Sequence, residues 1–431
     1  MKTLDIHSRS FAAAYKKVVD RGDVETGGVQ TVVRKILREV KGKGDHAVLR
    51  YTHRFDRIKL DAATMRIGRE EIKRAYDQAD PSVVDSLQYA AKRIEAFHQA
   101  QKKTGWSIQR AGVYLAQRVH PLDRVGLYVP GGTAAYPSSV LMNAIPARVA
   151  GVAQVAMCSP TPNGAINPYL LVAADIVGVE EIYRIGGAQA IAALAYGTQT
   201  IPRVDKIVGP GNPYVAEAKR QVYGAVGIDM IAGPSELLLI ADDQAHPVYV
   251  ASDLLSQAEH DPQAVVIFLT TSKKLVAAVE QEIKAQQARL SRRAMIATAL
   301  KNHGVTFIVP DIQRAIEMAN EIAPEHLSLF VAEPFVWLEK IKHAGSVFLG
   351  EMTPQALGDY IAGPNHVLPT GGTARFSSPL SVDDFIKKSS VISYAQDALR
   401  EGGPHLVRLA EAEGLSAHAN MVRVRLPADN A

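Results

Sequence analysis

The sequence lacks several features that mark particular classes of protein. It has a single cysteine, Cys158, which cannot form a disulfide within the chain, as is typical of proteins in a reducing compartment. No run approaches the ~18 apolar residues that a membrane helix needs. The N-terminal segment MKTLDIHSRSFAAAY lacks the apolar stretch of a signal peptide. We therefore expect a cytoplasmic protein.

An excess of charge of one sign is also missing. Lys and Arg total 48 and Asp and Glu total 44, which gives a formal net charge of +4. The local basic cluster near Lys41 and Lys43 is better explained as a solvated helix end than as a surface for nucleic acid. We expect neither nucleic acid nor membrane as a partner.

The lone thiol raises a chemical question, because a cysteine can capture an aldehyde as a nucleophile. Cys158 lies in the apolar segment Val155-Ala-Met-Cys-Ser-Pro, which has strand character. Buried thiols of this kind usually serve packing. We favour the packing role.

What is present is the composition and length of a globular protein with more than one domain. The chain has 431 residues, of which 47% are hydrophobic and 21% charged. The first third is mostly helical: apolar residues at helical spacing predict a helix over 27–40, and Asp80-Pro81-Ser82 opens another that reaches about Gln101. Extended segments follow at 113–119 and 125–129.

From there strands and helices alternate, which predicts parallel, doubly wound α/β units. The strand candidates are 154–157, 181–185, 206–208, 237–240, 264–269, 306–309 and 346–349. The helix candidates between them include 138–150, 188–196, 213–222 and 247–260. The last fifty residues return to a helical and polar pattern.

Three glycine-rich corners follow strand candidates: Tyr128-Val-Pro-Gly-Gly, Ile185-Gly-Gly-Ala-Gln and Gly209-Pro-Gly-Asn. None is a GxGxxG fingerprint. Each alone is better explained as a tight turn. Three at successive strand ends suggest a ligand site, since ligands of open α/β sheets bind at the carboxyl ends of strands.

Four further segments carry residues capable of chemistry. In Ser256-Gln-Ala-Glu-His-Asp-Pro, Gln257 and His260 lie three apart near a helix end, where they could share a metal ion or form a polar helix end. In Ala323-Pro-Glu-His-Leu, the adjacent Glu325 and His326 suit acid–base work near neutral pH, or a surface turn.

The other two segments are more ambiguous. Asp359, in Ala356-Leu-Gly-Asp-Tyr-Ile-Ala-Gly-Pro-Asn-His, could be a turn residue or an oxygen ligand. Glu413 and His418, in Ala412-Glu-Gly-Leu-Ser-Ala-His, lie near the C-terminus, where a histidine is usually solvated.

Together these segments resemble one family. At SQAEHDP, APEHL, GDYIAGPNH and EAEGLSAH, and at the corners LYVPGG, GGAQAI and GPGN, the chain resembles histidinol dehydrogenase. The resemblance covers essentially the whole chain, and the motifs occur in the order and spacing of the family. Every residue discussed below matches the family pattern.

The resemblance implies a role for each of these residues. One Zn²⁺ per subunit would be bound by Gln257, His260 and Asp359 of one subunit and by His418 of the partner subunit. Glu325 and His326 would handle protons. NAD would contact Tyr128, Gln189 and Asn212. The substrate would contact Ser235, Glu413, His326 and the four zinc ligands, with His366 as a weaker candidate.

The implied reaction is the oxidation of L-histidinol to L-histidine through L-histidinal, at the end of histidine biosynthesis, with two NAD used in turn. Zinc would hold the imidazole and amino groups of histidinol so that its alcohol carbon faces the nicotinamide. His326 would take the hydroxyl proton in each oxidation, and Glu325 would activate the water that hydrates the aldehyde.

The implied fold has two large Rossmann-like, doubly wound domains with small N- and C-terminal helical pieces, in an intertwined homodimer. We expect an N-terminal piece at 1–22, a first α/β domain at 23–131 with 237–378 that carries the zinc and catalytic residues, a second α/β domain at 132–236 with the NAD-contacting corners, and a tail domain at 379–431 that completes the partner's active site.

Three alternatives remain open at this stage. The nearest is a related enzyme that oxidises another small polar alcohol, such as a sulfonated diol, and turnover of L-histidinol separates the two. A zinc-dependent hydrolase in which Glu325 activates water would not depend on NAD. A metal-binding protein without catalysis would have no need of Glu325 and His326.

Overall fold

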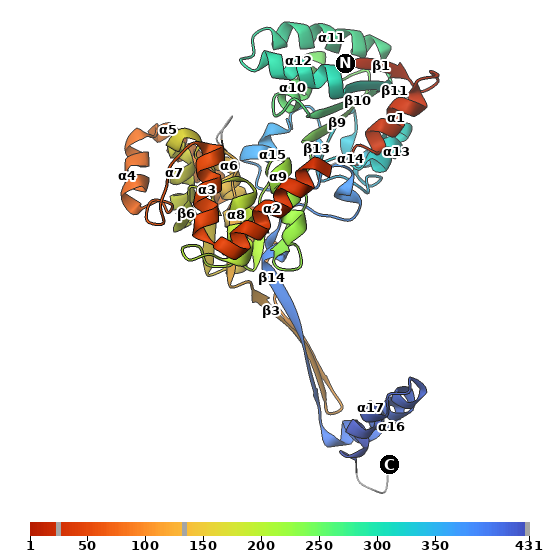
Figure 1. The fold of residues 1–431 in the computed structure, drawn as a ribbon. Helices are drawn as coiled ribbons and strands as arrows, with labels where there is room; N and C mark the ends of the chain where they lie inside the picture. The colour runs from red at the N-terminus through yellow and green to blue at the C-terminus, as the bar shows by residue number, and fades with distance from the viewer. Residues whose placement is uncertain (23–26, 132–135, 427–431) are drawn as a thin grey trace. The chain divides into compact units, whose positions relative to one another are not determined.

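The computed structural model describes residues 1–22, 27–131 and 136–426, and the chain divides into two compact units (Figure 1). The larger unit comprises Met1–Gln101 and Leu122–Phe385, and the smaller unit comprises Lys102–Pro121 and Ile386–Ala431. Gly132 of the first corner, the expected domain boundaries at 23 and 132, and the end of the expected tail domain lie outside the described residues. No described helix is long and apolar enough to cross a membrane.

The first sheet of the larger unit has six parallel strands. Their order is β1 (Lys2–Asp5), β11 (Gly304–Ile308), β10 (Val265–Thr270), β9 (Glu236–Ala241), β12 (His326–Phe330) and β13 (Ser346–Leu349). One face packs against α10 (Pro247–Ala258), α11 (Lys273–Gln287) and α12 (Arg293–His303), and the other against α1 (Phe11–Val19) and α13 (Ile312–Ile322) (Figure 1). Two short helices, α14 (Pro334–Leu338) and α15 (Ala356–Tyr360), follow β12 and β13.

Strand β9 shows why this sheet is apolar throughout. Leu237 and Leu239 pack among α10, α11 and α12, whereas Leu238 and Ile240 pack on the α13 side. Because helices cover both faces of the sheet, successive residues are all buried and the strand loses the apolar–polar alternation of a half-exposed strand.

The second sheet of the larger unit has five parallel strands. Their order is β6 (Glu181–Tyr183), β5 (Gln154–Cys158), β4 (Arg124–Tyr128), β7 (Lys206–Val208) and β8 (Gly227–Ile228). One face packs against α4 (Arg69–Gln78), α5 (Pro81–Gln99), α6 (Pro137–Ala150) and α7 (Pro168–Ile176). The other packs against α2 (Gly27–Lys43), α3 (Asp45–Asp56), α8 (Gly187–Tyr196) and α9 (Pro213–Val222).

The smaller unit combines an antiparallel sheet with two helices. The sheet order is β14 (Ile386–Tyr394), β3 (Val113–Pro121) and β2 (Trp106–Arg110), and the helices are α16 (Gln396–Ala412) and α17 (Ser416–Arg423). Our expectation of a wholly helical C-terminal piece was therefore wrong for β14. Its sequence IKKSSVISY is polar and mostly exposed, and it becomes a strand by pairing with β3, far away in the sequence.

The α/β class with parallel sheets is confirmed, and local signals marked several element starts correctly. Helix α5 begins at Pro81, and the Asp80 side chain accepts the Ser82 N–H at 2.8 Å, as an N-cap residue does.

The N-terminal piece is not purely helical, because β1 forms the edge of the first sheet beside β11. Strand β4 lies before the expected boundary at residue 131 yet pairs with β5 and β7, which lie after it. The domain boundaries as a whole stay a prediction.

Candidate active site

The predicted acid–base pair lies at the amino end of β12 and is buried. Helix α13 ends at Ile322, and Ala323 adopts a left-handed conformation with φ +50°, which closes the helix. Pro324 then favours an extended chain, so that Glu325 and His326 enter the middle of the first sheet between β9 and β13. This rules out the surface-turn alternative for the pair.

The backbone of one residue, Glu236 at the start of β9, holds both members of this pair. Its N–H donates to Oε2 of Glu325 at 2.7 Å, and its carbonyl oxygen accepts a hydrogen bond from Nδ1 of His326 at 2.9 Å. Because a carbonyl oxygen can only accept, Nδ1 of His326 carries a proton and Nε2 is the free nitrogen of the neutral ring. Nε2 lies 3.9 Å from Oδ1 of Asp359.

The surroundings of His326 favour its protonated form in the absence of any other cation. Burial lowers the pKa of His326, but the negative charges of Glu325 and Asp359 and the hydrogen bond to Glu236 raise it to about 9. Oε2 of Glu325 lies 3.5 Å from Nδ1 of His326, close enough for this charge effect.

His366 lies beside the same carboxylate. Its Nδ1 donates to the backbone oxygen of Asp359 at 2.9 Å, and its Nε2 accepts from the Ser139 hydroxyl at 3.1 Å. Burial holds the pKa of His366 below its usual value, and the positive charges of His326 and His260 lower it further, although Asp359 acts in the opposite direction. The contacts of Asp359 with His326 and His366 therefore bring these three residues together.

The two residues of the SQAEHDP motif separate at the end of α10. Gln257 is the last but one residue of the helix and is fully buried, whereas His260 lies beyond the helix end and is partly buried. Oε1 of Gln257 accepts from Nε2 of Gln355 at 2.9 Å, and Nε2 of Gln257 has no hydrogen-bond partner. Because the Gln257 amide is buried, the alternative of a solvated polar helix end does not apply to this residue.

Within the described residues no group of three or more His, Cys, Asp or Glu side chains is arranged to hold a metal ion. The predicted ligand set explains this in part. One of its four members is a glutamine, and another, His418, belongs to the smaller unit. Ser235, the predicted substrate contact, lies just before β9 and is partly buried, and its carbonyl oxygen accepts the Val265 N–H at 2.9 Å.

The three glycine-rich corners meet at the carboxyl ends of strands in the second sheet. The hydroxyl of Tyr128, at the end of β4, accepts the N–H of Gly187 at 3.1 Å. Gly209, which follows β7, has φ +108°, and a Cβ on it would lie 2.1 Å from the carbonyl oxygen of Tyr128. Only glycine fits there, because the two backbones touch. Strand order also reverses at β4, with β5 and β6 on one side and β7 and β8 on the other, where such sheets bind ligands.

The two amides predicted to contact NAD have different surroundings. Gln189 is buried near the start of α8, and its Oε1 has no hydrogen-bond partner. Asn212 is exposed, and its Oδ1 caps α9 by accepting the N–H groups of Tyr214 and Val215, which leaves its NH₂ group for a ligand. The corner GPGN is thus a helix start as well as a candidate ligand site.

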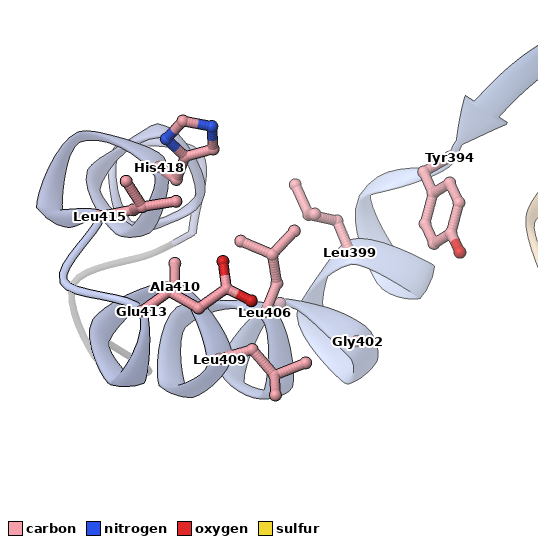
Figure 2. A pocket seen from close by; sticks show the side chains of 10 residues that line it. Tyr394, Leu399, Gly402, Leu406, Leu409, Ala410, Glu413, Leu415 and His418 are labelled. Atoms are coloured by element: carbon pink, nitrogen blue, oxygen red, sulfur yellow. The ribbon is translucent and has the colours of Figure 1, made fainter.

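The remaining predicted residues lie in the second sheet and in the smaller unit. Cys158, at the end of β5, is fully buried, and burial raises the pKa of its thiol, which supports the packing role. Glu413 and His418 are exposed in the smaller unit and line one pocket together with Leu406, Leu409 and Leu415 (Figure 2). Their position relative to Glu325 and His326 stays a prediction.

Our reading of the sequence missed Glu236 and Gln355. A charged residue at the head of the apolar run Glu236-Leu-Leu-Leu-Ile is a signal that could have pointed to Glu236. Nothing local marks Gln355. The position of the acid–base pair at a strand entrance was predicted, because the pair follows a helix ending near Ile322 and precedes an apolar run, and α13 and β12 confirm it.

Comparison with known proteins gives a consistent result. A family model described as histidinol dehydrogenase matches residues 19–426. A histidinol dehydrogenase of Geobacter sulfurreducens is 51% identical over 428 residues, covering 99% of this chain and 100% of that protein, and one of Bacillus cereus is 54% identical over 426 residues, covering 98% and 99%. The crystal structure of histidinol dehydrogenase from Elizabethkingia anophelis superposes with a TM-score of 0.93 at 38% identity, covering 100% of this chain and 99% of that one.

Proposed function

This chain belongs to the histidinol dehydrogenase family, and on that basis we propose that it oxidises L-histidinol to L-histidine through L-histidinal with two NAD in turn. Family membership makes it an oxidoreductase, so the alternatives of a hydrolase and of a metal-binding protein without catalysis are set aside. The observation that carries the proposal is the buried pair Glu325 and His326, with Nε2 of His326 directed toward Asp359.

His326 has the geometry of a general base for both oxidations, and a zinc ion held by Asp359 would offset part of the negative charge that raises the pKa of His326. Its Nδ1–H is fixed on the Glu236 carbonyl oxygen, so Nε2 accepts the hydroxyl proton of histidinol while the hydride of the alcohol carbon passes to NAD. The products of this step are L-histidinal, NADH and protonated His326. Release of that proton to solvent restores the base.

Glu325 suits the hydration step between the two oxidations. Its Oε2 is held by the Glu236 N–H, which leaves Oε1 to take a proton from the water that adds to the aldehyde carbon. With that proton on Glu325 the hydrate is an anion. It loses its hydride to another NAD and its remaining hydroxyl proton to His326, which yields the carboxylate of L-histidine. A single acid–base pair therefore serves all three steps.

The residues of the proposed metal site fit Zn²⁺. Its ligands would be Gln257, His260 and Asp359 together with the partner's His418, a set of nitrogen and oxygen donors that zinc accepts. The buried, unpartnered end of the Gln257 amide supports this choice. If the side-chain amides of Gln257 and Gln355 are both rotated by about 180°, so that O and N exchange places, their mutual hydrogen bond is preserved. The side-chain carbonyl oxygen of Gln257 then occupies the unpartnered position. Zinc would supply a binding point for the imidazole and amino groups of the substrate.

The NAD site is proposed at the three corners. Tyr128, Gln189 and Asn212 would contact the coenzyme, and the free Oε1 of Gln189 and the NH₂ group of Asn212 offer an acceptor and donors to it. The meeting of the corners at the strand-order reversal supports this placement.

In this proposal the protein is a homodimer, and residues of the partner subunit complete each active site. Ser235 and the partner's Glu413 would contact the substrate, and the partner's His418 would reach the zinc. Leu406, Leu409 and Leu415 are exposed beside Glu413, which supports the burial of this surface against a second chain. His366, whose neutral ring is already bonded to Ser139 and Asp359, has a supporting position.

A steady-state assay with a panel of alcohols tests the proposal. We expect NAD-dependent turnover of L-histidinol with a kcat/KM far above that for other small polar alcohols, including a sulfonated diol. A preference for another alcohol, with histidinol inert, would assign this chain a different substrate within the same family.

A further inference from the structure

A buried ion pair connects the N-terminal segment to the candidate active site. Nε of Arg21 donates to Oε1 of Glu236 at 2.8 Å, and Nη2 lies 2.5 Å from Oε2, so the guanidinium grips the carboxylate with two parallel bonds. The two side chains are only 7% and 2% exposed. The residues are 215 positions apart in the sequence, and no element of secondary structure contains Arg21.

The same guanidinium also binds the end of α13, which leads to the acid–base pair. Nη1 of Arg21 donates to the carbonyl oxygen of Ile322 at 3.0 Å and to that of Val18 at 2.9 Å. Ile322 is the last residue of α13, three positions before Glu325. Arg21 thus satisfies a carbonyl group that the helix end leaves without a partner.

Glu236 connects this ion pair to both proton-handling residues. Its backbone N–H and carbonyl oxygen hold Glu325 and His326, as described above, and its carboxylate accepts the N–H of Gly371 at 2.7 Å and that of Glu325 at 3.4 Å. A Cβ on Gly22 would lie 2.5 Å from the carbonyl oxygen of Gly371, so the residue after Arg21 also packs on this loop. The segment carrying Arg21 is therefore fitted closely around Glu236.

We infer that Arg21 is a positioning residue for the acid–base pair and acts through Glu236. The inference rests on the proposed function of Glu325 and His326. Removal of the guanidinium leaves a buried carboxylate without a counter-charge, and this carboxylate contacts the backbone N–H of Glu325. Glu236 must then take up a proton or move toward water, and its backbone moves with it. Lysine is a poor replacement, because a single ammonium cannot reproduce the two-bond fork.

Kinetics of matched variants test this inference. In Arg21→Leu we expect kcat with L-histidinol to fall by about 100-fold, the loss typical of a misplacement by about 1 Å, with the KM for NAD and the bound zinc close to wild type. Arg21→Lys should give an intermediate kcat. The double variant Arg21→Leu/Glu236→Gln should recover at least about 10-fold over Arg21→Leu, because the unpaired charge is gone while the backbone groups that hold the pair remain.

The control is a second ion pair of the same unit, between the buried Arg124 and the partly buried Glu181. Arg124 binds Glu181 through bonds of 2.8 and 2.6 Å, with side chains 9% and 21% exposed, at the start of β4. Arg124→Leu should lower the melting temperature as Arg21→Leu does and leave kcat close to wild type. The inference is overturned if Arg21→Leu loses no more kcat than Arg124→Leu, or if the double variant recovers nothing.

A crystal structure of Arg21→Leu gives a readout that does not depend on turnover. We expect the contacts from Glu236 to Glu325 and His326 to be lengthened or broken. Unchanged contacts in the variant would overturn the inference, whether or not the wild-type protein oxidises histidinol. Failure of the wild-type protein to oxidise histidinol would by itself contradict only the proposed function. If Arg21→Leu does not fold, Arg21→Lys takes its place in both measurements, and a wild-type kcat in that variant would equally overturn the inference.

Discussion

Nε2 of His326 lies 3.9 Å from Oδ1 of Asp359, so the proposed base and a proposed zinc ligand face the same space. Strands β12 and β13 are parallel neighbours in the first sheet. His326 is the first residue of β12, and Asp359 lies in α15, which follows the carboxyl end of β13. A cation bound here would lie beside the proposed general base.

The first prediction concerns the metal. His260→Ala should purify with strongly reduced zinc and with little turnover, because it removes one of four proposed ligands. Chelation should likewise abolish turnover of the wild-type enzyme. His303→Ala, which removes a partly buried histidine of α12, is the control and should keep its zinc. Full zinc and full activity in His260→Ala would refute the ligand assignment.

The second prediction separates the roles of the adjacent pair. Hydration of the aldehyde needs an activated water, whereas oxidation of the alcohol does not. Glu325→Gln, which keeps an oxygen to accept the Glu236 N–H, should therefore impair oxidation of histidinal more than oxidation of histidinol. His326→Asn should impair both, by the roughly 100- to 10,000-fold typical of a lost general base. Equal losses in the two half-reactions of Glu325→Gln contradict this division.

The third prediction concerns the subunit boundary. If His418 serves the partner's site, His326→Ala and His418→Ala are each inactive, but a mixed dimer carries one site with both changes and one with neither. Random assembly after co-expression makes mixed dimers about half of the population, so roughly a quarter of wild-type activity should return. If mixed dimers are isolated and remain inactive, His418 serves its own chain.

The fourth prediction is a pH dependence of stability. Burial raises the pKa of Asp253 from 3.8 to about 6, against the hydrogen bond from the Gln355 N–H. The folded protein therefore favours the protonated, neutral form of Asp253. The stabilisation that comes from this protonation is complete at low pH and is lost as the pH rises through about 6. Asp253→Asn stays neutral and can still accept this hydrogen bond.

The free energy of unfolding of Asp253→Asn relative to wild type should therefore increase by about 1 kcal/mol between about pH 5 and pH 7.5. Denaturant titration of both proteins at the two pH values measures this difference. A difference that does not change with pH would mean that Asp253 titrates in the folded protein as it does in the unfolded chain.

The sequence predicted what depends on neighbouring residues. Apolar runs such as Leu237–Ile240 marked buried strands, and Pro81 and Pro213 marked helix starts. The glycine-rich corners pointed to the strand ends that Tyr128 and Gly209 bring into contact. These features are local, so one sequence is enough to recognise them.

Long-range features were beyond this kind of reasoning. Strand β14 is polar and forms because it pairs with β3, which lies more than 260 residues earlier in the sequence. Ile392, for example, pairs with Leu115. Arg21 and Glu236 are separated by 215 residues, and nothing around Arg21 indicates a buried partner. The roles of Glu325 and His326 came from the family resemblance, whereas their attachment to the backbone of Glu236 required the structure.

The ratio of NADH formed to L-histidine formed tests the central claim most directly. Purified enzyme with L-histidinol and excess NAD should give two NADH for each histidine, with no free histidinal accumulating, because one site carries both oxidations. Absorbance of NADH and chromatographic measurement of histidine in the same samples provide the ratio. One NADH per histidinol consumed, with histidinal as the final product, would contradict the account.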